Sequence, residues 1–316
     1  MSDDNDNNVV NERNVLERLL LAHLNEQRRT RRWGVFFKLT GVVWLFLVFF
    51  MLLGQFDGEF VSTEPHTALV DINGEIGGDD GVMADTLIGA LNSAFDDKHT
   101  KAVVLRINSP GGSPVHAGQV FDEIKRLRAK HAQIPLYVVI DDICASGGYY
   151  IAAAGDKIFV DKASLVGSIG VLMDGFGFTE SMKKLGVERR LLTAGENKGF
   201  LDPFSPKQAN QEIHAKLMLE EIHQQFIQVV RKGRGSRLKE TPDMFSGLVW
   251  SGARSIELGL ADALGSLDTV ARDVVKVEEI VDFTPQEGLA DRLARRIGTA
   301  LGDAMQPWAK NAMQLR

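Results

Sequence analysis

The chain has 316 residues, of which 44% are hydrophobic and 25% charged, values typical of a globular protein with one large domain or two small ones. Its formal net charge of −6, without a stripe rich in arginine, lysine and aromatic residues, argues against nucleic acid as a partner. The single cysteine, Cys144, cannot form a disulfide within the chain, so an oxidising compartment is tolerated but not required.

The N-terminal region predicts a membrane anchor. Residues 1–32 begin with acidic and amide side chains and continue with leucines at helical spacing, which indicates a cytoplasmic segment with a short helix. Residues 33–53 are apolar apart from Lys38, and about 20 such residues span a bilayer. Residues 54–66 are expected to be a linker. Because no small-x-small cleavage motif follows the span, we expect an uncleaved signal anchor.

The charges on either side of the span predict its orientation. The N-terminal side is basic, with Arg28, Arg29, Arg31 and Arg32, whereas the acidic Asp57 and Glu59 follow the span. The basic side of a membrane segment stays in the cytoplasm, so the rest of the chain should lie outside the inner membrane, in the periplasm of a Gram-negative bacterium. A buried core helix, the alternative, would show a polar face, which this segment lacks.

From residue 67 onward, strand and helix patterns alternate. Strands are expected at 68–72, 102–107, 136–140, 157–160, 168–173 and 188–192, and helices at 83–95, 115–128 and 206–231. Repeated strand–helix units indicate an α/β fold, and we assign 67–282 to one domain. The final segment, 283–316, is predicted to form an amphipathic helix that packs on a neighbouring subunit or rests on the membrane.

Two strand ends are rich in glycine. The strands at 102–107 and 136–140 both run into glycine turns, and the second places Ser146 directly before Gly147 and Gly148. Glycines leave room for a substrate backbone, and the N–H groups of a helix start can stabilise an oxyanion. In adjacent βα units the two strand ends would lie side by side. Each turn alone is also typical of an ordinary helix cap.

A serine nucleophile needs a base, and the seven histidines offer no obvious one. None lies in a glycine-rich or strand-end setting after Ser146, although His116, expected on a helix surface, stays open. A lysine can replace histidine when desolvation lowers its pKa from about 10.4 toward 7 or 8. Lys198 lies in a glycine-flanked loop. A lysine in a loop is most often a solvated charge, so spacing alone does not select it.

Four motifs, in this order and spacing, resemble the signal peptide peptidase A family of membrane serine peptidases. They lie within a region of similarity over 67–266 and comprise Asn108 to Gly112, Ala145 to Tyr149, Val166 to Val171 and Gly195 to Gly199. The resemblance implies a ClpP/crotonase-like spiral of ββα units, preceded by one transmembrane helix. The chain resembles the half-length members of the family, because it has no second glycine-flanked serine turn of this kind.

The resemblance also implies roles for six residues. The nucleophile would be Ser146 and the general base Lys198, with Ser168 hydrogen-bonded to the lysine. The oxyanion N–H groups would come from Gly147 and from the turn that contains Gly111 and Gly112. The soluble ClpP-type peptidases have a histidine about two dozen residues after their serine, where this chain has Ser168 to Val171, so a Ser-Lys dyad is favoured over a triad.

The sequence thus predicts a membrane-anchored serine endopeptidase that cleaves remnant signal peptides or other membrane-derived peptides. We expect no metal and no organic cofactor, and the resemblance implies a homo-oligomeric ring. One alternative is a non-catalytic membrane scaffold that binds exported proteins, which loss of Ser146 or Lys198 would have suggested. Another is a crotonase-like acyl-CoA enzyme, against which a periplasmic location argues.

Overall fold

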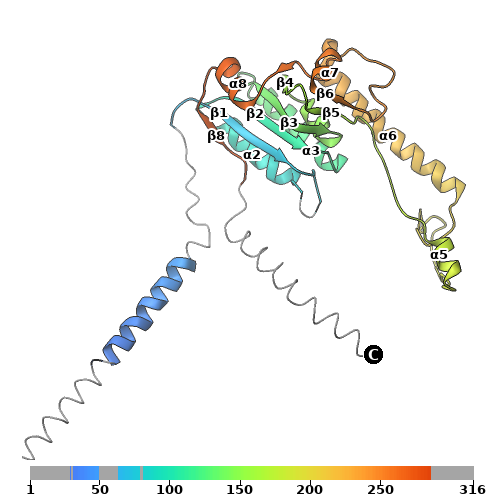
Figure 1. Ribbon diagram of the computed structural model, residues 1–316, viewed down its shortest axis with the longest axis horizontal. Coiled ribbons are helices and arrows are strands. Elements are labelled where there is room, and N and C mark those ends of the chain that lie inside the picture. Colours follow the sequence, from blue (N-terminus) through green and yellow to red (C-terminus); the bar gives the residue numbers. More distant parts are fainter. Residues whose placement is uncertain (1–28, 30, 50–62, 79–80, 286–316) are drawn as a thin grey trace, which may run out of the picture. The chain divides into compact units, whose positions relative to one another are not determined.

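The structure is a computed structural model that describes residues 29, 31–49, 63–78 and 81–285 (Figure 1). Its apolar helix, Arg31–Phe49, has 19 residues and is long and apolar enough to cross a membrane. The segment from Val61 to Pro285 forms a compact unit of its own. The predictions for 1–28, for the linker at 54–62 and for the C-terminal helix at 286–316 lie outside the described residues.

Eight strands of the described chain form one sheet, in the order β6-β5-β3-β2-β1-β8, with β4 paired to β3 and β7 paired to β4. The strands are β1 (His66–Asn73), β2 (Thr100–Ser109), β3 (Leu136–Ala145), β4 (Lys157–Val160), β5 (Leu165–Gly167), β6 (Val249–Ser251), β7 (Ala263–Leu264) and β8 (Ile280–Asp282). Every pair is parallel except β5 with β6. The α/β fold class is therefore confirmed.

Helices cover both faces of the central strands. They are α2 (Ala84–Asp96), α3 (Pro114–Lys130), α4 (Gly147–Ala152), α5 (Thr179–Lys184), α6 (Ala209–Arg234), α7 (Gly252–Glu257) and α8 (Leu267–Thr269), which continues into a π-helical turn, Val270–Val275. Figure 1 shows α2 and α3 together on one side of the sheet, where their apolar side chains join the main core. On the other side Val270 packs with Val104, Val139 and Phe159. Burial on both faces explains why these strands are near-continuous apolar runs.

The strand β3 is longer than its apolar run. The run stops at Ile140, yet the strand continues through Asp141 and Asp142 to Ala145 because its partner changes from β4 to β5. This extension carries the chain directly to Ser146. The domain also begins one residue earlier than expected, since His66 belongs to β1.

The predicted strands at 168–173 and 188–192 are wrong. Neither range forms a strand, and residues 172–207, here called the arm, instead leave the sheet with α5 near their far end (Figure 1). The arm is held together by its own contacts, such as the Phe178 N–H donating to the Pro203 carbonyl at 2.7 Å. It is joined to α6, where the Leu201 N–H donates to Gln211 Oε1 at 3.0 Å.

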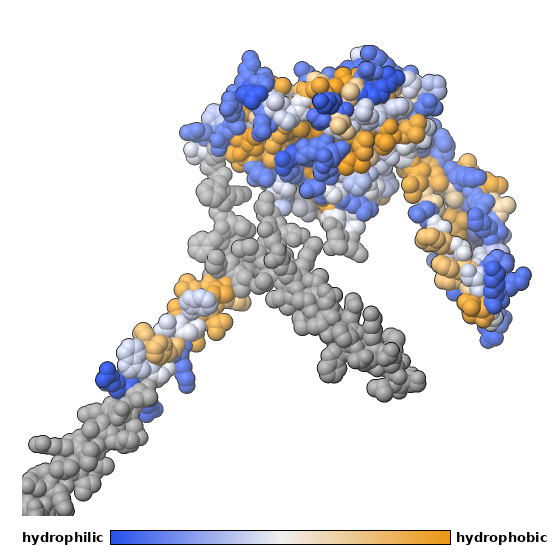
Figure 2. Space-filling view, in the orientation of Figure 1, coloured by the Kyte–Doolittle hydropathy of each residue, from blue (hydrophilic) through white to orange (hydrophobic). Residues whose placement is uncertain are grey.

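The arm exposes apolar side chains along its length (Figure 2). Leu172, Phe176, Leu185 and Leu192 are 80%, 79%, 77% and 96% exposed. Of the residues that predicted strands, Leu172 and Leu192 are thus exposed in this chain, whereas Ile169 is buried in the main core.

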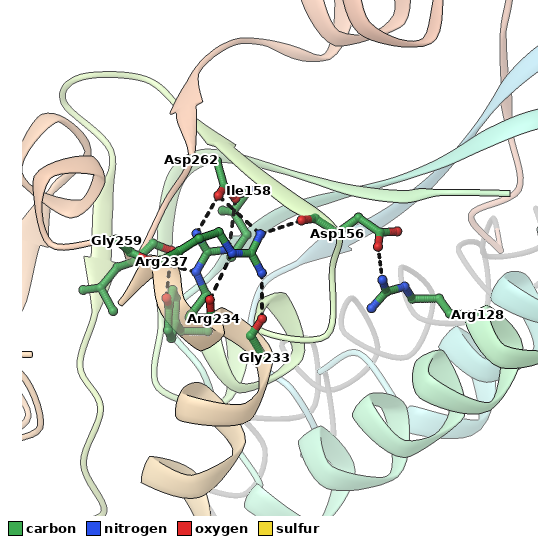
Figure 3. Close-up of polar contacts among 10 residues, drawn as sticks. Arg128, Asp156, Ile158, Gly233, Arg234, Arg237, Gly259 and Asp262 are labelled. Atoms are coloured by element: carbon green, nitrogen blue, oxygen red, sulfur yellow. Dashed lines mark hydrogen bonds and ion pairs between the residues drawn. The ribbon is translucent and has the colours of Figure 1, made fainter. Parts of the chain in front are cut away.

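A cluster of charged groups lies at the C-terminal end of α6 (Figure 3). The Arg234 side chain is fully buried, and its Nη1 donates to Asp262 Oδ2 at 3.0 Å. The same carboxyl oxygen accepts the Ile158 N–H at 2.7 Å. Burial raises the pKa of Asp262, but the hydrogen bond and charge of Arg234, the Ile158 N–H and Arg237 outweigh burial, so its pKa lies below the ordinary value.

This carboxyl group predicts an acid-sensitive fold. Because its folded-state pKa is lowered, the stability that ionised Asp262 contributes is complete above the unfolded pKa of about 3.9 and is lost as the pH falls through the folded-state value. Asp262→Asn leaves Arg234 without its anion, which should cost about 3–5 kcal/mol at neutral pH, and it should flatten the loss of stability in acid.

Thermal unfolding of the detergent-solubilised full chain between pH 7 and pH 3 measures both effects. The control is Asp243→Asn, which alters an exposed carboxyl outside the cluster and should change neither the unfolding temperature nor its pH dependence. An Asp262→Asn protein with the unfolding temperature and acid dependence of the unaltered chain would contradict the prediction.

Candidate active site

Ser146 stands between the end of β3 and the start of α4, in a backbone conformation that L-residues rarely adopt. Its φ is 50° and its ψ is −121°, and its side chain makes no capping hydrogen bond. Ser146 thus occupies the N-cap position of α4 without the side-chain hydrogen bond of an ordinary helix cap. Its N–H donates to the Gly167 carbonyl at 2.9 Å, and its carbonyl accepts the Tyr150 N–H at 3.0 Å. A strained strand-to-helix turn of this kind presents a hydroxyl outward, as in hydrolase nucleophile elbows.

The two glycine turns lie side by side, as their place in adjacent βα units predicts. A Cβ on Gly111, whose φ is +110°, would stand 2.6 Å from the Ser146 Cβ and 2.9 Å from the Gly147 nitrogen. A Cβ on Gly112 would stand 2.1 Å from the Ile76 carbonyl oxygen. Only glycine allows the turn to approach the serine this closely.

The backbone N–H groups of the two glycine turns differ in their hydrogen-bond acceptors. The Gly111 N–H already donates to Ser109 Oγ at 3.1 Å. For Gly112 and Gly147, no acceptor of the backbone N–H lies within the described residues. A Cβ on Gly147 would stand 3.4 Å from the Gly112 nitrogen, so the two N–H groups are neighbours. They offer two adjacent donors beside the serine.

Ser168 directly follows β5 and lies close to Ser146. It follows Gly167, whose carbonyl binds the Ser146 N–H, and it too has a positive φ, 51°. Its own N–H donates to the Leu248 carbonyl at 2.8 Å, which fixes the turn against the segment before β6. The structure thus brings together Ser146, Ser168 and the three glycines.

Lys198 is not part of this group. It lies in the arm, exposed, in a turn where its N–H donates to the Gly195 carbonyl at 3.1 Å. Within the described residues, the hydrogen bonds, ion pairs and ring contacts of the arm stay inside it or reach α6. The arm leaves the sheet at which Ser146 lies (Figure 1). One chain therefore presents a serine and a lysine on separate parts.

His116, which the sequence left open as a base, is engaged elsewhere. It lies in the first turn of α3, half-buried, and its Nδ1 accepts the Ala84 N–H at the start of α2 at 3.2 Å. A Cβ on Gly77 would touch its ring. It is therefore a packing residue between two helices and not the free surface residue that was expected.

The sequence analysis missed the segment that supports the glycine turn. Ile76, fully buried, donates its N–H to the Gly111 carbonyl at 2.8 Å and accepts the Ser113 N–H at 2.7 Å. It thus forms a one-residue parallel bridge to Gly112. The only signal was the density of glycines around it, at Gly74, Gly77, Gly78 and Gly81.

A separate cleft of about 990 Å³ opens beside the strands β3 and β4. It is lined by acidic side chains, Asp141, Asp142, Asp161 and Asp273, together with small and apolar residues, and includes none of the six candidate residues. Within the described ranges, no group of three or more His, Cys, Asp and Glu side chains is arranged to hold a metal ion.

The close approach at Gly111 makes a direct prediction. Gly111→Ala should lower peptide hydrolysis by about 100-fold or more, because the new methyl group displaces the Ser146 side chain and the adjacent donors. Gly118→Ala is the matched control: it adds the same methyl group within α3, where nothing lies within 4 Å, and should leave activity unchanged. Both are measured as kcat/KM on a soluble peptide. Normal activity in a folded Gly111→Ala protein would contradict this geometry.

Comparison with known proteins decides the family. Residues 128–281 match the pattern of Peptidase family S49. The chain belongs to this family. The matched region includes Ser146, Ser168 and Lys198 and begins after the turn of Gly111 and Gly112.

Relatives of this S49 chain include proteins named as peptidases. It is 32% identical over 195 residues to a putative signal peptide peptidase SppA of Enterococcus faecium, a match covering 61% of this chain and 56% of that protein. It is 31% identical over 228 residues to protease 4 of Haemophilus influenzae, covering 71% of this chain and 36% of that protein.

A further relative carries a different name. The chain is 46% identical over 218 residues to a Brucella melitensis protein named Na(+)/H(+) antiporter NhaA, a match covering 68% of this chain and 29% of that protein. The S49 chain thus spans under a third of that protein's length. The activity in that name belongs to the whole of that longer protein.

Proposed function

We propose that this S49 chain is a membrane-anchored serine endopeptidase with a Ser-Lys dyad formed by Ser146 and Lys198. The observation that carries the proposal is the conformation of Ser146, a non-glycine residue held at positive φ beside two adjacent N–H donors. A residue in this strained state costs of order 1–3 kcal/mol, so its position requires a reason beyond packing.

In the proposed reaction, Ser146 Oγ attacks the scissile carbonyl carbon while neutral Lys198 takes the hydroxyl proton. The N–H groups of Gly112 and Gly147 hold the oxyanion, each good donor contributing about 3 kcal/mol in comparable hydrolases. The C–N bond then breaks, and Lys198 returns the proton to the leaving amine. A water, deprotonated by Lys198, then attacks the acyl-serine ester. The ester C–O bond breaks, and Lys198 returns the proton to Ser146 Oγ, which restores the enzyme. Ser168 positions the lysine amine.

The lysine comes from a neighbouring chain in this proposal. Lys198 lies on an arm whose hydrogen bonds, ion pairs and ring contacts, among the residues that the structure describes, do not reach the sheet of its own chain. The arm also exposes apolar side chains that a second copy would cover. A head-to-tail arrangement in which each arm reaches the next subunit's serine closes into a ring when the rotation allows it. The ring then has one complete site at each interface.

The substrates we propose are peptides that remain in or near the membrane, cleaved signal peptides among them. Two observations support this class. The chain carries an apolar helix long enough to span a membrane, and one relative is named a putative signal peptide peptidase. A catalytic domain tethered to the bilayer meets such peptides at high local concentration.

A fluorophosphonate probe tests the chemistry directly. The detergent-solubilised full chain is treated with the probe, digested, and the modified residue located by mass spectrometry. Modification of Ser146, lost after competition with a peptide substrate, is the expected result. Modification of another residue would assign the nucleophile to that residue. No modification together with no hydrolysis would favour the non-catalytic scaffold.

The membrane orientation is tested with a reporter enzyme that needs disulfide formation for activity. Fused after Gln314, the reporter should be active, because this end of the chain lies outside the cytoplasm; fused before Arg28, it should be inactive. Expression of both fusions is compared by immunoblot. The reverse pattern of activity would overturn both the orientation and the class of substrates.

A further inference from the structure

The short helix that follows the proposed nucleophile is joined to the segment 259–262 by one side chain. α4 has only six residues, Gly147–Ala152, so its own hydrogen bonds cannot fix its direction. The fully buried Tyr149 donates its hydroxyl to the Leu260 carbonyl at 2.7 Å, and burial raises the pKa of this hydroxyl, which therefore stays a donor. The position of α4 thus depends on the segment 259–262.

Arg234 binds that same segment at Gly259 and Asp262 (Figure 3). Its Nε donates to the Gly259 carbonyl at 2.8 Å, and its two terminal nitrogens lie 3.0 Å and 2.9 Å from the two carboxyl oxygens of Asp262. The planar guanidinium donates hydrogen bonds from Nε and Nη1, while Nη2 makes only the ion pair with Asp262 Oδ1. A lysine ammonium has the same charge but lacks this planar fork. Asp262 is fixed in turn by the Ile158 N–H at the start of β4.

The helix α6 also touches α4 directly. A Cβ on Gly233 would stand 2.1 Å from the Ala153 carbonyl oxygen, immediately after α4, so the two backbones are in contact there. Arg237 donates to the Gly233 and Arg234 carbonyls at 2.8 Å and 3.0 Å and so closes the end of α6. The backbone contact at Gly233, the ring contact between Tyr150 of α4 and Phe226 of α6, and the bonds of Arg234 together fix the direction of α6 relative to α4.

The other end of α6 carries the arm. Gln211, through which the arm is joined to α6, lies about 35 Å along the helix from Arg234 at 1.5 Å per residue, so a tilt of about 5° at Arg234 would move the arm by roughly 3 Å. A misplacement of about 1 Å can cost about 100-fold in rate. The fixed end of α6 therefore controls the placement of the arm that bears Lys198.

We infer that Arg234 is a positioning residue, which acts through the segment 259–262 and Tyr149 to set the angle between α4, which carries the serine, and α6, which carries the arm. This inference rests on the proposed function. Replacing a buried ion pair by apolar residues is often neutral for stability, so stability alone does not explain a buried arginine at this point.

Two substitutions with matched controls test the inference in the detergent-solubilised full chain. Tyr149→Phe removes one hydroxyl, and its control is Tyr150→Phe, whose ring packs on Phe121 and Phe226. Arg234→Lys removes the planar guanidinium group. Its control is Arg231→Lys on the same helix, where Arg231 makes an exposed ion pair with Glu240. Tyr149→Phe and Arg234→Lys should each lower kcat about 10-fold or more, with KM and oligomer size unchanged. Each control should stay within about twofold.

The double variant separates positioning from general damage. If Arg234 acts through the segment that Tyr149 binds, the two losses of kcat should not multiply in Tyr149→Phe/Arg234→Lys, whereas those in Tyr149→Phe/Arg231→Lys should. If Arg234→Lys does not fold, Tyr149→Phe decides alone. Unchanged kcat in folded Tyr149→Phe, or a loss of kcat that only follows the loss of folded protein, overturns the inference. Persistent hydrolysis in Ser146→Ala, measured in parallel, would instead overturn the proposed function.

Discussion

Replacing Ser146 or Lys198 by alanine should each reduce peptide hydrolysis to background, a loss of about 10⁴-fold or more, because either change removes a group that the reaction needs in every turnover. Lys198→Arg should be equally inactive, since a guanidinium stays protonated and cannot accept the serine proton. The measurement is kcat/KM of the detergent-solubilised full chain, with oligomer size checked for every variant.

Lys184→Ala is the control for the lysine. Lys184 is another exposed lysine of the arm, at the end of α5, and its loss should leave hydrolysis within about twofold of normal. Substantial hydrolysis by Lys198→Ala would remove this lysine from the mechanism and leave the base unidentified. Inactivity of Lys184→Ala as well would indicate that the arm acts by its surface and not by one amine.

Mixing the two inactive chains should restore activity. In a ring assembled from equal amounts of Ser146→Ala and Lys198→Ala chains, about a quarter of the interfaces pair an intact serine with an intact lysine from the neighbour, so about a quarter of normal activity is expected. The chains are co-expressed with different tags, and mixed rings are purified through both tags before the assay.

The negative control replaces the Lys198→Ala chain by the double variant Ser146→Ala/Lys198→Ala, a mixture in which no complete site can form. Mixed rings of the two single variants that stay as inactive as this control would place the dyad within one chain, with the arm folding back onto its own sheet. Activity above a quarter would indicate preferred pairing of unlike chains.

The sequence predicted the strands that are buried by their own chain. β1, β2 and β4 are apolar because helices and the turn after α8 cover both faces, so a local apolar run was a sufficient signal. The glycine turns were predictable for a related reason. Consecutive parallel strands place their ends at one edge, which brought Gly111 against Ser146.

A local apolar run gave a wrong prediction on the arm, where the chain does not bury the side chains. Leu191 and Leu192 form an apolar run that predicted a strand, yet they are 42% and 96% exposed on the arm. A local apolar run thus predicts a strand only where helices or neighbouring strands of the chain bury it. In the opposite direction, Asp141 and Asp142 concealed the continuation of β3, because pairing with a second partner strand is not written in a local pattern.

The positive φ of Ser146 and Ser168 lowers the stability of the fold at the two positions where the proposed reaction needs a serine hydroxyl. Glycine would hold these turns with less strain, since it adopts positive φ without the penalty of roughly 1 kcal/mol or more that a side chain brings. A laboratory selection for heat resistance alone should therefore convert both positions to glycine early and yield a hardier, inert protein. Attempts to engineer a thermostable form of this chain should hold the two serines fixed and seek their gains elsewhere.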